Sequence, residues 1–341
     1  MQFVSGMGGT SSDIPTSGQV DSSGNSYVAG LFQGTADFDP GAGTTNLTSA
    51  GANDIFIAKY DSSGALVWAK GVGGTSNDSN VALQIDSSGN SYVTRSFRDT
   101  ADFDPDAGTA NLTSAGSYDS FIAKYDSSGA LVWAKGVGGT GTDIGNAIQI
   151  DSSGNSYVTG YFSGTADFDP GAGTTNLTSA GGNDTFIAKY DSSGALVWAK
   201  GIGGTSSDIA ASMQIDSGGN SYLIGTFQGT ADFDPGAGTT NLTSAGGNDV
   251  FIAKYDSTGA MVWAKNVGGT SSDTGSSIAV DSNGNSYVAG TFEGTADFDP
   301  GAGTTNLTSA GDTDLFIAKY DSTGALVWAK NAGGTDTDQA A

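Results

Sequence analysis

The sequence predicts an all-β protein, a five-bladed β-propeller with four antiparallel strands in each blade. Three observations support this prediction. One motif returns with a step of 65 residues and no insertion or deletion, each repeat combines short apolar strands with hairpin turns, and no segment has the apolar period of a helix. The step is easiest to follow in the Phe of Ala-Asp-Phe-Asp-Pro, at Phe38, Phe103, Phe168, Phe233 and Phe298.

The third repeat shows the expected strands in order. We predict strands at residues 146–150, 156–162, 186–190 and 195–200, with a long connection over residues 163–184. Asp-x-x-Gly turns join the other strands, because Asp bonds to the backbone that follows it and Gly supplies a positive φ. Four antiparallel strands that recur as a unit are typical of a propeller blade. An open β-solenoid is the alternative, but a unit with two hairpins forms a self-contained sheet rather than one coil.

The repeats also set the predicted domain organisation. We expect residues 1–341 to form a single propeller with blades at about 12–76, 77–141, 142–206, 207–271 and 272–336, followed by a tail at 337–341. Residues 1–16 duplicate the fourth-strand segment at 326–341, so residues 1–11 are expected to form an extra N-terminal strand. A ring closed by strand exchange between the termini needs this strand once. The surplus copy can pack at an edge, can be donated to a neighbouring molecule, or can simply reflect a longer parent array.

Composition narrows the classes of function. Twelve basic and 36 acidic residues give a net charge of −24, which argues against nucleic acid and anionic membranes as partners. The sequence has no His, the commonest general base, and no apolar run long enough to insert into a membrane. We therefore expect a protein that is not an enzyme, with no catalytic residues and no organic cofactor. No signal peptide is recognisable in this sequence.

A compound motif indicates a family. Residues 314–330 read Asp-Leu-Phe-Ile-Ala-Lys-Tyr-Asp-Ser-Thr-Gly-Ala-Leu-Val-Trp-Ala-Lys, and residues 278–290 read Ile-Ala-Val-Asp-Ser-Asn-Gly-Asn-Ser-Tyr-Val-Ala-Gly. Together they resemble the bacterial β-propeller repeat family abbreviated SBBP, five times along the chain; the second half is also similar to NHL-type repeats. The resemblance implies a secreted or surface-displayed propeller, extracellular in location, without catalytic residues. It also implies that the first strand of each repeat lies nearest the axis and the fourth at the rim.

Each repeat has one Trp, always at the same position of the fourth strand. A Trp at this position can form a sugar-stacking platform or part of the core between blades, and we predict the core. The residues are Trp68, Trp133, Trp198, Trp263 and Trp328.

A glutamine recurs at one position of the first strand, and Ala279 interrupts the series. Because side chains alternate along a strand, its amide is expected to face away from the flanking Ile side chains. Near the axis these amides would line a channel that holds water, a small polar ligand or an ion. The candidates are Gln19, Gln84, Gln149 and Gln214.

The second repeat carries the best metal candidate. Asp102, Asp104 and Asp106 place three carboxylates at alternate positions, a pattern that can bind Ca²⁺ through oxygen ligands. The alternative is that each Asp caps its own turn. The same repeat contains both arginines, Arg95 and Arg98, at positions where the other repeats have different residues. These charged substitutions mark either a specific binding site or neutral sequence change in which opposite charges pair on the surface.

The sequence thus favours a non-enzymatic scaffold or interaction module, rigid, acidic and displayed outside the cell. Its expected partners are its own copies, extracellular proteins or glycans, with strand exchange through the N-terminal segment as one route. A lectin-like or Ca²⁺-dependent glycan-binding propeller is the second hypothesis. A hydrolase with paired carboxylates on the propeller axis is the third, and one Glu and no His weaken it.

Overall fold

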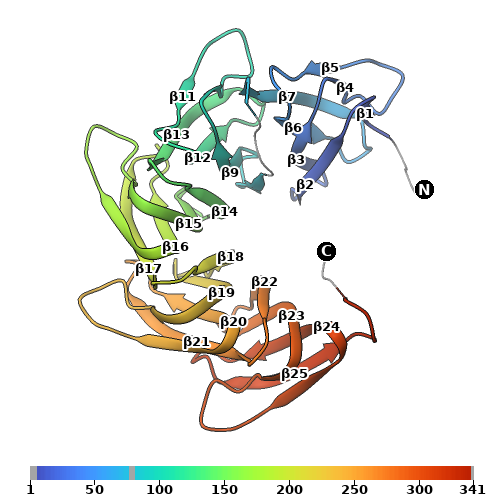
Figure 1. Ribbon diagram of the computed structural model, residues 1–341. Coiled ribbons are helices and arrows are strands. Elements are labelled where there is room, and N and C mark those ends of the chain that lie inside the picture. The colour runs from blue at the N-terminus through green and yellow to red at the C-terminus, as the bar shows by residue number, and fades with distance from the viewer. Residues whose placement is uncertain (1–5, 77–80, 339–341) are drawn as a thin grey trace. The chain divides into compact units, whose positions relative to one another are not determined.

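The prediction of an all-β chain built from propeller-type repeats is confirmed. The computed structural model describes residues 6–76 and 81–338, and in these residues there are strands and turns but no helix (Figure 1). The start of the predicted N-terminal strand at 1–5, the repeat boundary at 77–80 and the last residues of the predicted tail at 339–341 lie outside the described residues. The described part contains no helix long and apolar enough to span a membrane.

The last three repeats each contain four strands. They are β14 (Ile144–Ile150), β15 (Ser156–Asp167), β16 (Asn176–Tyr190) and β17 (Leu196–Gly204); β18 (Ile209–Ile215), β19 (Ser221–Asp232), β20 (Asn241–Tyr255) and β21 (Met261–Gly269); and β22 (Thr274–Val280), β23 (Ser286–Asp297), β24 (Asn306–Tyr320) and β25 (Leu326–Ala332). Within the fourth repeat β18, β19, β20 and β21 pair in sequence order, and each pairing is antiparallel.

In the first two repeats the long second and third strands are interrupted. The strands there are β2 (Asp13–Val20), β3 (Ser26–Phe32), β4 (Thr35–Asp37), β5 (Asn46–Thr48), β6 (Asp54–Tyr60) and β7 (Leu66–Gly74), then β8 (Ala82–Ile85), β9 (Ser91–Phe97), β10 (Thr100–Asp102), β11 (Asn111–Thr113), β12 (Asp119–Tyr125) and β13 (Leu131–Gly139). The pairing order β2, β3, β6, β7 repeats the four-strand pattern, and Figure 1 shows these strands side by side.

The prediction of a long irregular connection between the second and third strands was wrong. In the fourth repeat the two strands continue as a hairpin in which Thr230 pairs with Thr243 and Asp232 with Asn241. The threonine hydroxyls lie 2.8 Å apart, and the Asp232 carboxylate accepts the Thr240 N–H at 2.8 Å, which closes the remaining loop. The Gly, Ala and Thr composition of this segment hid a strand whose stability comes from cross-strand pairing.

The fourth strand links each repeat to the next. β21 pairs with β20 over most of its length, and then its last two residues, Gly268 and Gly269, pair with Asp297 and Ala296 of β23. Only a glycine fits this crossing, because a β-carbon on Gly269 would overlap the carbonyl oxygen of Thr295. Successive repeats are therefore joined by main-chain hydrogen bonds as well as by side-chain packing.

The N-terminal segment forms the same link for the first repeat. β1 (Gly8–Gly9) pairs with β4, Gly8 opposite Asp37 and Gly9 opposite Ala36. In the second repeat Gly73 and Gly74 of the preceding fourth strand take these positions opposite Asp102 and Ala101. The described part of the duplicated segment thus substitutes for the end of a preceding fourth strand.

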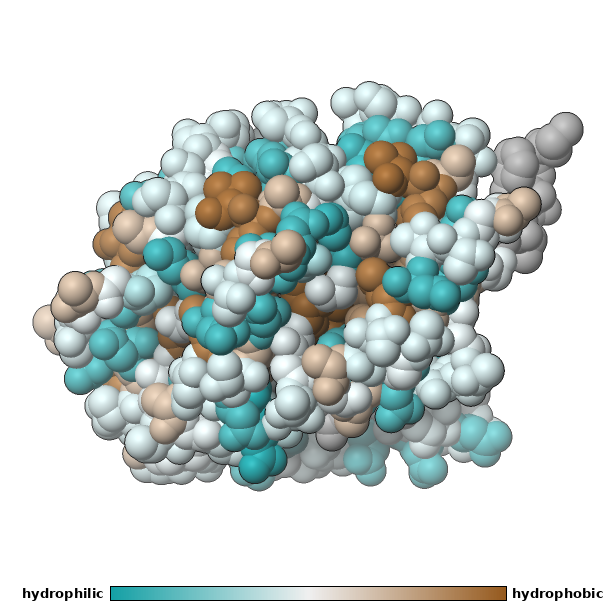
Figure 2. Space-filling model, turned by 90° about the horizontal axis from the view of Figure 1, so that it is seen from above, coloured by the Kyte–Doolittle hydropathy of each residue, from teal (hydrophilic) through white to brown (hydrophobic). Residues whose placement is uncertain are grey.

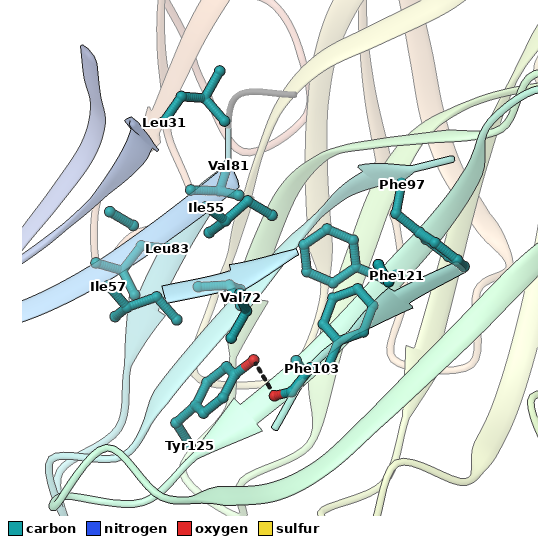
Figure 3. Packing of buried hydrophobic residues seen from close by; sticks show 14 of the residues in the cluster. Leu31, Ile55, Ile57, Val72, Val81, Leu83, Phe97, Phe103, Phe121 and Tyr125 are labelled. Atoms are coloured by element: carbon teal, nitrogen blue, oxygen red, sulfur yellow. Dashed lines mark hydrogen bonds between the residues drawn. The ribbon is translucent and has the colours of Figure 1, made fainter. Parts of the chain in front are cut away.

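The core continues from one repeat into the next. In Figure 3, Phe97, Phe103 and Phe121 of the second repeat contact one another, and Tyr125 donates its hydroxyl hydrogen to the Phe103 carbonyl at 3.0 Å. Ile55 and other first-repeat side chains belong to the same buried cluster. Apolar burial therefore stabilises adjacent repeats against each other.

The chain divides into two compact units, each described here by itself. One consists of residues 1–156, 165–176 and 190–196, and the other of residues 157–164, 177–189 and 197–341. A closed five-bladed ring over residues 1–341 requires a particular placement of these units, and it stays a prediction.

Candidate functional site

The turn between the first and second strands of each repeat is held by one aspartate. In the first repeat Asp21 Oδ1 accepts the backbone N–H groups of Ser23 and Asn25 at 2.9 Å each, and Oδ2 accepts the Asn25 side-chain amide at 2.7 Å. These hydrogen bonds, the Asn25 side chain above all, lower the pKa of Asp21. Gly24 has φ +82°, the left-handed conformation that the turn requires. The loop is therefore rigid and its carboxylate stays ionised.

Grooves lie between these turns in successive repeats, and we call them turn grooves. In the first unit one lies between the Asp21 and Asp86 turns and a second between the Asp86 and Asp151 turns, with volumes of about 400 and 440 Å³. In the second unit a groove of about 430 Å³ lies between the Asp216 and Asp281 turns. Each is lined by Asp, Ser, Tyr and Lys side chains, so the same polar recess is presented more than once.

A lysine and a tyrosine form a pair in each turn groove. Lys124 Nζ lies 4.9 Å from the centre of the Tyr92 ring, and the equivalent distance for Lys254 and Tyr222 is 4.7 Å. This cation–π geometry places one lysine between two turn aspartates. Tyr27 also donates its hydroxyl hydrogen to the Gly89 carbonyl of the next turn at 3.4 Å. The groove can therefore offer ligands both hydrogen-bond donors and acceptors.

A second series of recesses lies beside the loop after Ala-Asp-Phe-Asp-Pro, and we call them loop grooves. One of about 360 Å³ is lined by Asp119, Lys135, Gly138, Asp167 and Asp169, among others. An equivalent groove of about 290 Å³ in the second unit contains Asp184, Asp232 and Asp234. Both bring carboxylates of successive repeats to one recess.

The predicted core tryptophans lie at the junctions between repeats. Trp198 packs edge-on against Tyr157 of its own repeat, with ring centres 6.2 Å apart, and donates its indole N–H to the Ser257 carbonyl of the next repeat at 3.2 Å. A β-carbon on Gly259 would lie 3.1 Å from this indole, so the next repeat covers that part of the ring. Trp68, Trp133 and Trp263 bond in the same way to Ser127, Ser192 and Ser322. Trp328 packs against Tyr287.

The predicted channel glutamines lie half-buried on the first strands. Gln84, Gln149 and Gln214 each follow a buried apolar residue on β8, β14 and β18, and Gln19 lies at the equivalent position of β2. Alternation along the strand therefore turns the amides away from these apolar neighbours. A common channel depends on how the repeats of both units are arranged, and it stays a prediction.

The three aspartates predicted to bind Ca²⁺ already have protein partners. Asp102 Oδ1 accepts the N–H groups of Asp104 and Ala110 at 3.0 and 2.8 Å, and Asp104 Oδ1 accepts the Asp106 N–H at 3.0 Å. Asp106 pairs with Lys70. Within residues 6–76 and 81–338 no group of three acidic, His or Cys side chains is placed to hold a metal. These contacts favour the turn-capping interpretation, and Ca²⁺ binding by this loop stays a prediction.

The other charged residues that are particular to the second repeat, Arg95, Arg98 and Asp99, do not form one cluster. Arg95 donates to the Asn146 side chain at 2.8 Å, towards the third repeat. Exposed Arg98 lies 3.7 Å from Asp99, a pair that contributes little energy. Asp99 has φ +58° where the other repeats have glycine, and it accepts the Ser76 hydroxyl at 2.6 Å.

The sequence analysis missed two sets of residues that line these recesses and junctions. The first is the groove lysine series, which the constant Ile-Ala-Lys-Tyr motif could have indicated. The second is a set of buried aspartates, each at the start of the apolar half of a third strand. They are Asp54, Asp119, Asp184, Asp249 and Asp314. The signal was present, since an Asp lies two residues before the Phe of every Phe-Ile-Ala-Lys-Tyr segment.

Apolar surface is dispersed. The exposed large hydrophobic residues include one valine per fourth strand, and Figure 2 shows separate hydrophobic patches among hydrophilic residues on the face it draws. These valines are Val67, Val132, Val197, Val262 and Val327. Single exposed apolar residues of this kind are normal on protein surfaces and do not by themselves mark an interface.

Comparison with known proteins gives matches in sequence. Uncharacterized WD repeat-containing protein L264 of Acanthamoeba polyphaga mimivirus is 27% identical over 391 residues, which cover 92% of this chain and 28% of that protein. Regulatory protein FlaEY of Caulobacter vibrioides is 26% identical over 242 residues, 64% of this chain and 25% of that protein. The chain therefore spans little more than a quarter of the length of these relatives.

A solved structure of a protein of unknown function from Bacteroides caccae aligns with a TM-score of 0.38 and 10% identity, over 94% of this chain and 82% of that one. No argument rests on a similarity of this size. Residues 262–291 match the family model described as the beta-propeller repeat, SBBP. The resemblance seen in the sequence is therefore confirmed: residues 262–291 match the SBBP repeat, and the matched motif recurs along the chain at a constant step.

Proposed function

We propose that this protein is a non-enzymatic interaction scaffold, displayed at the cell surface or secreted, in which five repeats close into a five-bladed propeller. The observation that carries the proposal is the recurrence of the turn groove with the same residues in both units. An enzyme concentrates its chemistry in one differentiated site. A series of equivalent shallow recesses suits a protein that binds a repetitive partner at several points.

The groove chemistry supports a neutral, polar ligand. One lysine charge is flanked by two turn carboxylates, and serine and asparagine groups supply further donors and acceptors. A carbohydrate or a polar peptide segment fits this inventory, whereas a polyanion would be repelled by the net charge of −24. Each recess near 400 Å³ is at the small end of ligand pockets, so single contacts would be weak.

Several weak contacts can give strong binding when they act together. Linking equivalent sites on one rigid body raises overall avidity by about 10²–10⁴ without any new contact. The fourth-strand crossings support the required rigidity, because each repeat is hydrogen-bonded to the next. The SBBP resemblance supports the proposal of extracellular display, and antibody labelling of intact cells tests it.

The test begins with glycan and peptide arrays probed in CaCl₂ and in EDTA. For any ligand found, binding is measured by biolayer interferometry at several ligand densities. The groove variant carries Lys59→Ala, Lys124→Ala and Lys254→Ala. The control carries Lys200→Ala, Lys265→Ala and Lys330→Ala, which removes the same charge from the fourth strands.

We expect the groove variant to lose at least tenfold in avidity at high density while the control binds as the unmodified protein does. Equal losses in both variants would mean that net charge alone governs binding. No loss in either would exclude the turn grooves as the binding site.

A Ca²⁺-dependent glycan binder is the second candidate, because the loop grooves gather carboxylates from successive repeats. Glycan binding that vanishes in EDTA and returns with CaCl₂ would support it. Turnover of any glycoside on the same array would instead revive a hydrolase.

A further inference from the structure

Two buried aspartates meet at each junction between successive repeats. One belongs to the third strand of a repeat, and the other immediately precedes the first strand of the next. Asp184 and Asp208 are 4% and 1% exposed, and Asp249 and Asp273 are 0% and 1% exposed. Asp119 and Asp143 form the equivalent pair in the first unit. We call these the junction aspartates.

A glycine of the crossing fourth strand fixes how close the two carboxylates lie. The position that a β-carbon would take on Gly138 is 2.9 Å from Asp119 Oδ1 and 2.9 Å from Asp143 Oδ2, so these oxygens are separated by no more than twice that distance. The same point on Gly268 is 2.7 Å from Asp249 Cγ and 2.8 Å from Asp273 Oδ2. Both carboxylates therefore pack against one glycine, where a β-carbon would clash with them.

The hydrogen bonds of the pair are incomplete. Asp184 Oδ2 accepts the Ala180 N–H at 2.8 Å. Both oxygens of Asp208 are bonded, Oδ2 to the Gly204 N–H at 2.7 Å and Oδ1 to the Gln228 N–H at 3.3 Å, so one oxygen of the pair is left without a donor. Oδ1 of Asp184 is buried with no hydrogen-bond donor, and the same holds for Oδ1 of Asp119 and of Asp249. An unpartnered buried carboxylate oxygen is costly, and its recurrence at equivalent junctions indicates that something is bound there.

Basic side chains do not supply the missing charge. Across the part of the chain that the structure describes, no lysine or arginine forms an ion pair with Asp184, Asp208, Asp249 or Asp273. Removing two carboxylates from water without a counter-charge costs several kcal/mol per ion. At these two junctions a cation or a proton from solution must therefore supply the balancing charge.

The loop grooves give access to the junction aspartates. Asp119 lines one groove together with Asp167 and Asp169, and Asp184 lines another together with Asp232 and Asp234. These additional carboxylates increase the negative potential of each recess. A proton neutralises only one carboxylate, whereas a divalent cation balances both members of a pair and provides a partner for the unbonded oxygens.

We propose that each junction between successive repeats binds one divalent cation of the Ca²⁺ type between its two junction aspartates. Two of the described sites, Asp119 with Asp143 and Asp249 with Asp273, each pack against one glycine. The third is Asp184 with Asp208, whose N–H donates to the carbonyl of Asn183 beside Asp184. Carboxylate oxygens are ligands that Ca²⁺ prefers, and water or backbone carbonyls complete such sites. With two carboxylates per site, the affinity belongs in the range of roughly 10⁻⁴–10⁻³ M known for extracellular modules. The sites differ from the Asp102 loop and do not depend on the proposed scaffold function.

Calcium binding is measured by equilibrium dialysis of the full chain at pH 7.5 over 0 to about 5 mM CaCl₂, a range set by the expected affinity. Thermal unfolding in CaCl₂ and in EDTA is recorded on the same samples. The test variants are Asp184→Asn and the combination of Asp119→Asn, Asp184→Asn and Asp249→Asn. Asp312→Asn, at an exposed position of β24, is the charge-matched control. A variant with Asn at Asp102, Asp104 and Asp106 tests the competing loop site.

We expect the unmodified protein to bind several Ca²⁺ ions per chain. The single junction variant should lose one of them, the triple variant three, and the two other variants none. The increase in Tm that CaCl₂ gives should shrink in the same order. Because dialysis of the unmodified protein needs no variant, poor folding of the triple variant does not remove the test.

Three results would overturn the proposal. One is an unmodified chain that binds no Ca²⁺ at millimolar concentration. Another is a stoichiometry that Asp184→Asn leaves unchanged. The third is a junction variant that is more stable than the unmodified protein by the same amount in CaCl₂ and in EDTA, which would show that the pair holds a proton.

Discussion

The junction aspartates predict an unusual dependence of stability on pH. Burial raises the pKa of Asp184 from 3.8 to about 6, and the neighbouring Asp208 carboxylate adds to the increase. Burial likewise raises the pKa of Asp273 to about 6, with the Asp249 carboxylate contributing. Since the folded protein binds these protons more tightly than the unfolded chain, unfolding free energy should fall as pH rises from about 4 to about 6 in the absence of divalent cations.

The magnitude follows from the size of the pKa change. One unit corresponds to 1.36 kcal/mol, so a change of about two units gives roughly 3 kcal/mol per carboxylate as an upper limit. Water in the adjacent loop groove reduces this to about 1–2 kcal/mol per junction. Several junctions together then alter unfolding free energy by a few kcal/mol, a large fraction of the 5–15 kcal/mol that is typical of folded proteins.

Turn aspartates produce the opposite dependence at lower pH. Hydrogen bonds from Ser193 and Ala195 lower the pKa of Asp191, and bonds from Asn285 lower that of Asp281. A lowered folded pKa contributes stability that is present above the unfolded value of 3.8 and is lost as pH falls through the folded value. Stability should therefore be greatest between about pH 4 and 5.

The assay is urea and thermal denaturation between pH 3 and 8 in EDTA, with unmodified protein, the pair of substitutions Asp184→Asn and Asp273→Asn, and Asp312→Asn. The unmodified protein and Asp312→Asn should lose stability between pH 4.5 and 7, and the paired variant should lose less. A Tm that stays constant or rises over this range would refute the reasoning, as would a paired variant with the full slope. Saturating CaCl₂ should flatten the slope of the unmodified protein.

Three further substitutions test the packing of the repeats. Trp198→Ala should cost about 3 kcal/mol in urea denaturation, because it removes the packing of a half-buried indole against Tyr157 and a hydrogen bond to the next repeat. Val197→Ala, at a side chain 52% exposed, should cost under about 0.5 kcal/mol, and equal costs would contradict the junction role. Tyr125→Phe leaves the buried Phe103 carbonyl unpaired and should cost about 1–2 kcal/mol, and an unchanged urea midpoint would show that this hydrogen bond contributes nothing. Gly164→Ala should lower stability by about 1–2 kcal/mol through its φ of +69° alone, since nothing lies within 4 Å of the added carbon; a rise in Tm would contradict the left-handed geometry.

Much of the local structure could be predicted from the sequence. The step of 65 residues located the repeats, and the Asp-x-x-Gly pattern located turns such as the one at Asp191, whose carboxylate bonds to Ser193 and Ala195. These features depend on chemistry within a few residues along the chain. For that reason they are readable without knowing which segments meet in space.

The prediction from local sequence was wrong for residues 163–184, where we expected an irregular connection. These small and polar residues have weak strand propensity, yet β15 extends to Asp167 and β16 begins at Asn176. Strand formation there depends on a partner strand, so composition alone indicated a loop.

The sequence by itself determined the repeat, its turns, its apolar strands and the acidic, histidine-free composition. Only the tertiary structure decided that Asp249 and Asp273 pack against one glycine and that a fourth strand crosses into the next repeat. The physical reason is that near-identical repeats offer equivalent pairing partners at every step. Which of them meet is fixed by packing and hydrogen bonds between segments distant in the chain, and no local pattern encodes those contacts.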